Sequence, residues 1–150
     1  MTTEINFYHL TRSSLEDALP RLLQKTLQAG ERAVVMVGSP ERVDSLNTHL
    51  WTYDDRGFLP HGSAKDGDAT RQPIWLTHLD ENPNGAAFLF VADRARSENV
   101  ASFKRCFELF DGRDEVAVAD SRERWKAYKT AGHTVVYWQQ TAAGGWEKKA

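Results

Sequence analysis

The sequence predicts an α/β protein, a Rossmann-like three-layer αβα sandwich with a mostly parallel central sheet, in a single domain. Segments with strand and helix character alternate along the chain, which is typical of a parallel sheet whose crossovers are helices. Residues 33–37 form a continuous β-prone run, and such runs are found in strands that are covered on both faces. The length of 150 residues suits about one domain with a substantial core.

The first third of the chain supplies two strand–helix pairs. A short strand is expected at 6–10, and a helix follows from a capping-box start at 13–17 to a stop at Gly30. After the strand at 33–37, a serine N-cap followed by proline begins a second helix over 39–50. This order is the signature of a right-handed βαβ unit.

The rest of the chain begins with an expected long loop at 51–72, which is rich in glycine and aspartate. Long loops in compact domains are usually functional or mobile. A polar tail, 141–150, is expected to follow a domain that ends at residue 140. Between them we expect strands at 74–77, 87–91, 106–110 and 134–139, a short helical stretch at 99–103 and a final helix at about 114–131.

Composition and charge narrow the class of protein. The formal net charge of -2 disfavours a general nucleic-acid coat, because such proteins usually carry a basic surplus. The single cysteine, Cys106, forbids an internal disulfide and is expected to pack in a buried strand. The N-terminus does not resemble a signal peptide, and no apolar run approaches the roughly 20 residues of a membrane span. A cytoplasmic location without membrane contact is expected.

The fingerprints of nucleotide binding are missing. The turn after the first strand, Thr11–Ser14, contains no glycine, and the turn after the second has one glycine followed closely by Pro40. Close approach of the backbone to a pyrophosphate needs glycine at such a turn, and no P-loop sequence occurs elsewhere. We therefore expect no cofactor and no catalytic site.

The five histidines do not form a metal-ligand pair at any usual spacing, so no metal site is expected. His61 lies in the glycine-rich loop and is the histidine with most scope for a chemical role. The alternative to a binding protein is therefore an enzyme that acts on a nucleotide or small molecule through His61 and the loop carboxylates Asp54 or Asp55.

The final helix carries the first candidate binding site. At 100° per residue, Arg122, Trp125 and Lys129 lie on one face, and Lys126 flanks them. An aromatic ring between cations suits an acidic peptide that also carries a large apolar side chain, and arginine can bind a carboxylate with two hydrogen bonds. The alternative is structural: the cations complement the helix dipole, and Trp125 or Tyr128 belongs to the buried stripe.

Trp51 and Phe58 mark a second candidate site at the start of the long loop. Large aromatic side chains are favoured interface anchors, and Pro60 and His61 continue this apolar block. The alternative is that these side chains fold back as a small satellite of the core.

Three blocks together resemble the chi subunit family of bacterial DNA polymerase III, a clamp-loader accessory protein. They are Phe7–Leu10, the Leu50-Trp51 and Phe58-Leu59-Pro60-His61 block, and the segment from Arg122 to His133. The resemblance spans nearly the whole chain and preserves the order of the motifs. It implies a Rossmann-like fold that binds no nucleotide.

The resemblance also implies two protein contacts. The first is the acidic C-terminal tail of single-stranded DNA-binding protein, for which Arg122, Trp125 and Lys126 match the family motif; Lys129 joins them through the helical-face geometry. The second is the psi subunit of the clamp-loader complex, for which Trp51 and Phe58 are the matching positions. Direct binding of nucleic acid through the basic helix is the least favoured alternative, because the formal net charge is -2. The expected function is a non-enzymatic link between the clamp loader and single-stranded DNA-binding protein during DNA replication.

Overall fold

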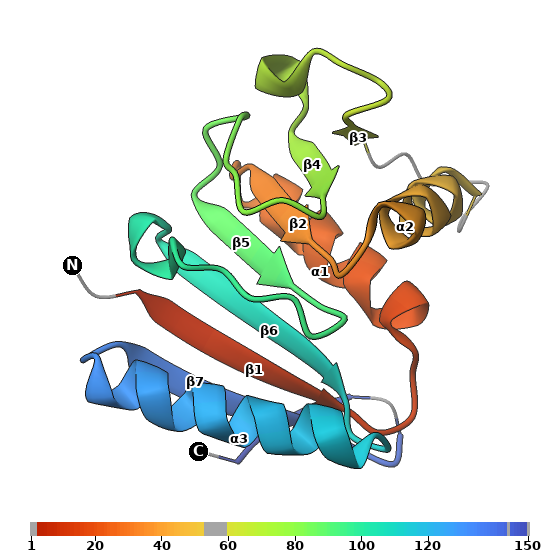
Figure 1. Cartoon of the computed structure of the whole chain (residues 1–150). Helices are drawn as coiled ribbons and strands as arrows, with labels where there is room; N and C mark the ends of the chain where they lie inside the picture. The colour runs from red at the N-terminus through yellow and green to blue at the C-terminus, as the bar shows by residue number, and fades with distance from the viewer. Residues whose placement is uncertain (1–2, 53–59, 144, 150) are drawn as a thin grey trace.

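A computed structural model describes residues 3–52, 60–143 and 145–149. Eight strands form one sheet in the order β3-β4-β2-β5-β6-β1-β7-β8 (Figure 1). The strands are β1 (Glu4–Leu10), β2 (Ala33–Met36), β3 (Gly62–Ser63), β4 (Ile74–Thr77), β5 (Phe88–Val91), β6 (Arg105–Asp111), β7 (Thr134–Gln140) and β8 (Trp146–Lys148). The helices are α1 (Leu15–Gln28), α2 (Pro40–Thr52) and α3 (Glu115–Thr130), with short 3-10 turns η1 (Ala69–Arg71) and η2 (Val100–Ser102).

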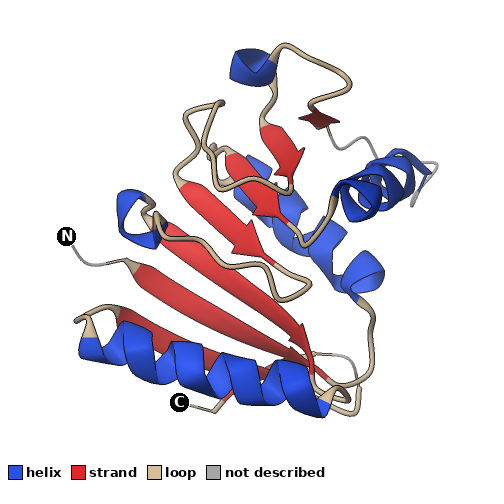
Figure 2. Ribbon diagram, in the orientation of Figure 1, coloured by secondary structure: helices blue, strands red, loops and turns tan. Residues whose placement is uncertain are grey.

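The sheet lies between two helical layers, as Figure 2 shows. All neighbouring strands are parallel except β7 and β8. Helices α1 and α2 cover one face, where leucines such as Leu19, Leu23 and Leu46 meet the sheet, and α3 covers the other, where Ala117 packs near Phe7. The predicted fold class is confirmed. Within the described residues, no helix combines the length and apolarity that crossing a membrane requires.

The helix starts follow the capping chemistry of the sequence. The Ser14 hydroxyl accepts a hydrogen bond from the backbone N–H of Asp17 at 3.3 Å, and Ser39 does the same for Arg42 at 3.2 Å. The Asp114 carboxylate caps α3 by accepting from two backbone N–H groups. These side chains satisfy amides that the first helical turn leaves without partners.

The C-terminal segment 141–150 and the segment 51–72 contain secondary structure that the sequence does not predict. The polar segment 141–150 contains β8, which pairs antiparallel with β7 and places Trp146 opposite Gln140. The segment 51–72 is not a loop throughout: α2 runs to Thr52, β3 pairs with β4, and η1 follows. Residues 53–59 lie outside the described part of the chain. The sequence does not reveal these edge strands, because β8 is three residues long and mostly exposed and β3 is only two residues long.

The order of the strands is not the order of the chain. β1 and β2 belong to the expected strand–helix–strand unit, yet β5 and β6 lie between them in the sheet. From the adjacent strands β1 and β6, the chain leaves in opposite directions: α1 leads to β2 on one side and α3 to β7 on the other (Figure 1). A crevice forms at such a reversal, outside the carboxyl ends of the strands.

Gly112 makes the turn after β6 possible. A Cβ atom at this position would meet the His9 ring at 1.9 Å and the Leu10 carbonyl oxygen at 2.9 Å, and the Gly112 N–H donates to that same carbonyl at 2.7 Å. The turn therefore lies directly against the end of β1, with no room for a side chain.

We predict that Gly112→Ala lowers the free energy of unfolding by about 1–3 kcal/mol, since a methyl group would overpack this contact. Gly145→Ala is the matched control, because its Cβ would meet nothing closer than 3.6 Å. Urea unfolding measures both. Equal stability of the two variants would contradict the close approach of Gly112 to His9.

Candidate functional site

The outer face of α3 presents the cations that the sequence predicts. Arg122, Lys126 and Lys129 are exposed, and Trp125 between them is half-buried. The Lys129 ammonium lies 5.8 Å from the centre of the Trp125 ring, within the range of a cation–π contact. The structure thus brings all four predicted residues onto one face of one helix.

The side chain of Trp125 lies partly in the core and partly at the surface. Its ring meets Phe7 of β1 edge to face at 5.6 Å and Tyr137 of β7 at 5.8 Å, which anchors it to the cluster beneath α3. The remaining part of the side chain is open to solvent between the cations. Trp125 therefore contributes both to the core beneath α3 and to the surface between the cations.

His9 and Tyr137 lie beside this face. The His9 Nδ1 atom and the Tyr137 hydroxyl form a hydrogen bond between β1 and β7. Burial lowers the pKa of His9, and the nearby Arg122 guanidinium lowers it further, against an opposing effect of Asp111. The imidazole is accordingly biased towards its neutral form, so the positive charge of the face resides on α3 itself.

A buried ion pair on the opposite side of α3 attaches the helix to the sheet. Arg124 donates from Nε to a Glu108 carboxylate oxygen at 3.2 Å, and the Tyr128 hydroxyl donates to the other oxygen at 3.0 Å. The side chains of Arg124 and Glu108 are only 8% and 2% exposed. Burial raises the pKa of Glu108, with Arg124 as the main opposing influence, and burial together with Glu108 raises the pKa of Tyr128.

The sequence carries a signal for this pair, which was not among the predicted features. Glu108 stands alone in the apolar run from Cys106 to Phe110, and a charge within a covered strand needs a partner. Ala117, Ser121 and Arg124 follow the helical spacing of the face that meets the sheet. Cys106 itself is fully buried, as expected, and burial raises the pKa of its thiol.

Gln140 fills the turn where a nucleotide-binding protein would hold a phosphate. Its side-chain carbonyl accepts hydrogen bonds from the backbone N–H groups of Thr11, Arg12 and Ser13 at 3.2, 2.8 and 2.9 Å. Its amide group donates to the Ser13 hydroxyl at 2.8 Å. The amides that follow β1 are therefore already satisfied from within the protein, by a residue 127 to 129 positions further along the chain.

The second candidate site is only partly described. Trp51, in the last turn of α2, is 50% exposed, and its ring lies 4.3 Å from that of His61. Phe58 lies outside the described residues. Trp51 therefore presents a large aromatic surface to solvent while it rests on His61.

His61 is buried and in contact with the backbone, as is usual for a residue with a structural role. It is 3% exposed, and its Nε2 atom lies 3.2 Å from the Asn47 carbonyl oxygen of α2. Asp54 and Asp55 belong to the part of the chain that is not described. Across the described ranges, no three histidine, cysteine, aspartate or glutamate side chains are grouped as metal ligands.

Fold and site together define a class of protein, a Rossmann-like α/β protein without a free phosphate-binding turn. The side chain of Gln140 occupies the amides after β1, and α3 displays a cationic face with an aromatic ring. Residues 1–136 match the family model described as DNA polymerase III chi subunit, HolC. The chain belongs to the DNA polymerase III chi subunit family.

Two relatives with curated names agree. A protein of Rickettsia prowazekii (strain Madrid E), named probable DNA polymerase III subunit chi, is 28% identical over 107 residues, which cover 71% of this chain and 65% of the relative. The Escherichia coli (strain K12) DNA polymerase III subunit chi is 21% identical over 121 residues, covering 80% of this chain and 82% of the relative. The match thus spans slightly less than two thirds of the length of the Rickettsia protein.

We predict that Gln140→Leu lowers the free energy of unfolding by about 2 kcal/mol, because three backbone donors lose their acceptor. Gln140→Glu, which keeps an oxygen at the same position, should lose less. Gln139→Leu, one residue earlier and half-buried, is the control, and thermal or urea unfolding compares the three. A Gln140→Leu variant as stable as the control would show that the turn does not depend on this side chain.

Proposed function

We propose that this protein is a non-enzymatic accessory subunit of DNA polymerase III, acting in the cytoplasm, that binds the acidic C-terminal tail of single-stranded DNA-binding protein. The observation that carries the proposal is the outer face of α3, where Arg122, Lys126 and Lys129 surround the half-buried Trp125. Membership in the chi subunit family supports the assignment to the polymerase.

The face supplies both kinds of contact that an acidic tail with an aromatic end requires. The guanidinium of Arg122 and the ammonium groups of Lys126 and Lys129 can bind carboxylates through charge-assisted hydrogen bonds. The apolar surface between α3 and β7, formed by Trp125 and Tyr137, offers a place for an apolar ring. Since the buried pair of Arg124 and Glu108 fixes the rotation of α3, the cations are presented without rearrangement of the helix.

The exposure of the cations also sets the strength of the contact. Ion pairs between exposed side chains contribute little each, typically ~0.2–1 kcal/mol, and salt screens them over about 8–10 Å. The proposed contact is therefore of moderate affinity and sensitive to ionic strength, as suits a link that must be made and released repeatedly during replication.

We predict that the double variant Arg122→Ala, Lys126→Ala binds a fluorescent acidic tail peptide about tenfold more weakly, because two charge-assisted contacts are removed. Binding of the unaltered protein should weaken as salt rises, and the double variant should show a smaller dependence on salt.

Fluorescence anisotropy measures these affinities. The matched control is Arg21→Ala, Arg71→Ala, which removes the same charge from exposed positions on α1 and η1. Affinity that is the same in both double variants would exclude the α3 face as the tail site.

The second proposed contact places the psi subunit, and through it the clamp loader, at Trp51 and Phe58. Support comes from the exposure of Trp51, half of whose surface is open to solvent at the end of α2. Exposed tryptophans are frequent anchors of protein interfaces. The face of α3 and the end of α2 lie on different elements on opposite sides of the sheet (Figure 1), so the two partners can bind together.

We predict that Trp51→Ala weakens binding of a co-expressed psi subunit by a factor of ten or more, on the order of the 2 kcal/mol typical of an interface anchor. Val116→Ala is the control, since Val116 is 52% exposed but lies on α3. Copurification and calorimetry report the result. If both variants retain psi equally well, Trp51 is not part of that interface.

A further inference from the structure

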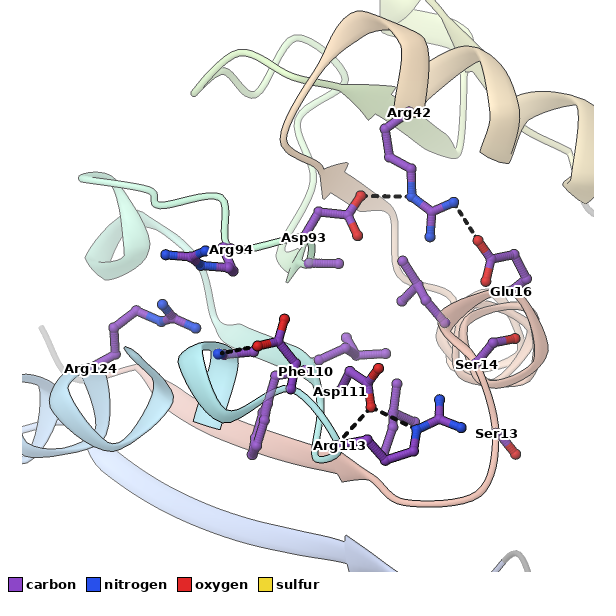
Figure 3. Close-up of a pocket in the computed structure, with 16 residues that line it drawn as sticks. Ser13, Ser14, Glu16, Arg42, Asp93, Arg94, Phe110, Asp111, Arg113 and Arg124 are labelled. Carbon is purple, nitrogen blue, oxygen red and sulfur yellow. Dashed lines mark hydrogen bonds and ion pairs between the residues drawn. The ribbon is translucent and has the colours of Figure 1, made fainter. Parts of the chain in front are cut away.

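A cavity of about 330 Å³ lies at the carboxyl ends of β1, β5 and β6. Its walls come from the turn and first residues of α1, the segment 92–94 after β5, and the turn from β6 into α3, as Figure 3 shows. This cavity is separate from the outer face of α3 and from Trp51, which do not line it.

The position of the cavity follows from the topology. β1 and β6 are neighbours whose connections leave in opposite directions, one through α1 and the other through α3. In open α/β sheets, ligands bind in the crevice at this reversal. The volume is at the lower end of the ~300–1,000 Å³ typical of ligand pockets, which suits a small molecule.

Arg124 brings an unpaired donor to this cavity. Its Nε atom is paired with Glu108 and its Nη2 atom lies 3.4 Å from the Ser121 hydroxyl. The Nη1 atom is buried and has no hydrogen-bond partner among the described residues. Arg124 lines the cavity, and in Figure 3 its guanidinium extends from α3 towards the cavity.

An unpaired N–H group of a buried guanidinium is costly, because it has lost water without gaining an acceptor. Buried polar groups in native proteins nearly always have a partner. The missing acceptor therefore points to a group that enters the cavity from outside the chain.

The acidic side chains around the cavity do not provide that acceptor, since Nη1 has no partner among the described residues and each of these carboxylates is turned to another group. Glu16 and Asp93 both pair with Arg42. Asp111 accepts from Arg113 at 2.9 Å, and Asp114 accepts from the amides that begin α3.

Arg124 therefore supplies the donor for a ligand in this cavity. A ligand that accepts hydrogen bonds, and that carries negative charge for the arginine, fits this arrangement. A dinucleotide does not fit, because Gln140 occupies the backbone amides that would hold its pyrophosphate.

The loop after β5 has an unusual backbone at the same place. Asp93 and Arg94 are consecutive non-glycine residues in the left-handed region, with φ of 54° and 63°. Such conformations are uncommon for non-glycine residues. Both residues line the cavity, and Arg94 pairs with Asp120 at 2.8 Å.

We propose that this cavity binds a small oxyanion-bearing molecule, whose single carboxylate or phosphate group accepts a hydrogen bond from Nη1 of Arg124. This site is independent of the proposed tail and psi contacts. Because Arg124 and the proposed tail-binding residues share α3, a ligand here would stabilise the helix that carries them.

The test uses inorganic phosphate and acetate as separate probes at constant ionic strength, with amide chemical shifts as the readout. We expect a saturable shift at the cavity amides of Ser14, Asp93 and Ala117 with at least one probe. A response to phosphate alone indicates a phosphate-bearing ligand, and a response to acetate alone indicates a carboxylate.

The variant Glu108→Gln, Arg124→Met removes the donor together with its buried partner, so that no lone charge remains in the core. Its affinity for the probe should fall about tenfold or more, the loss expected for a charge-assisted hydrogen bond. Ala117→Met keeps the ion pair and narrows the cavity, so it should also weaken binding of the probe. This second variant provides the test if the first does not fold. Arg71→Met, on η1, makes the same arginine substitution at a position that does not line the cavity, and it should bind normally.

Shifts that rise linearly with both probes, or a saturable response that is unchanged in both cavity variants, would overturn the proposal. The first result would mean that Nη1 is satisfied by water alone. The tail-peptide measurement reports on a different surface, so the failure of either proposal leaves the other intact.

Discussion

The buried pair of Glu108 and Arg124 is the constraint on which the orientation of α3 and its cationic face depends. A carboxylate in the middle of a covered strand cannot remain without a partner, and removal of one member of such a pair typically costs ~3–5 kcal/mol. Here the partner comes from α3, and Tyr128 one turn later binds the same carboxylate. These contacts fix the rotation of α3. Arg122 and Lys126, each two residues from Arg124, are thereby turned outwards.

A second constraint acts at the carboxyl ends of β1 and β7. Gln140, at the end of β7, holds the backbone of the turn between β1 and α1, so the same contact closes the sheet and occupies the amides that other Rossmann-like proteins offer to phosphate groups. The fold keeps the crevice at the reversal of strand order but does not keep a glycine-rich turn. This explains how the architecture retains a small cavity at the carboxyl ends of its strands although the phosphate-binding turn is filled.

The site was predictable to the extent that it depends on local spacing. The face with Arg122, Trp125, Lys126 and Lys129 follows from helical geometry alone, and the structure places these residues together. The division of Trp125 between core and surface could not be predicted, because it depends on Phe7 and Tyr137 from two other strands. The burial of His61 against Asn47 could not be predicted either, since the composition of a loop does not reveal which of its side chains turns inwards.

What the sequence by itself determined is the type and order of most elements: Ser14, Ser39 and Asp114 cap their helices through contacts a few residues away, and apolar runs define the central strands. Only the tertiary structure decided the order of strands in the sheet, the addition of β8 at its edge, and which arginine of the segment 122–124 is buried. The physical reason is distance along the chain. Capping and periodicity are local, whereas Glu108 with Arg124 and Gln140 with Ser13 pair residues that only the completed sheet brings together.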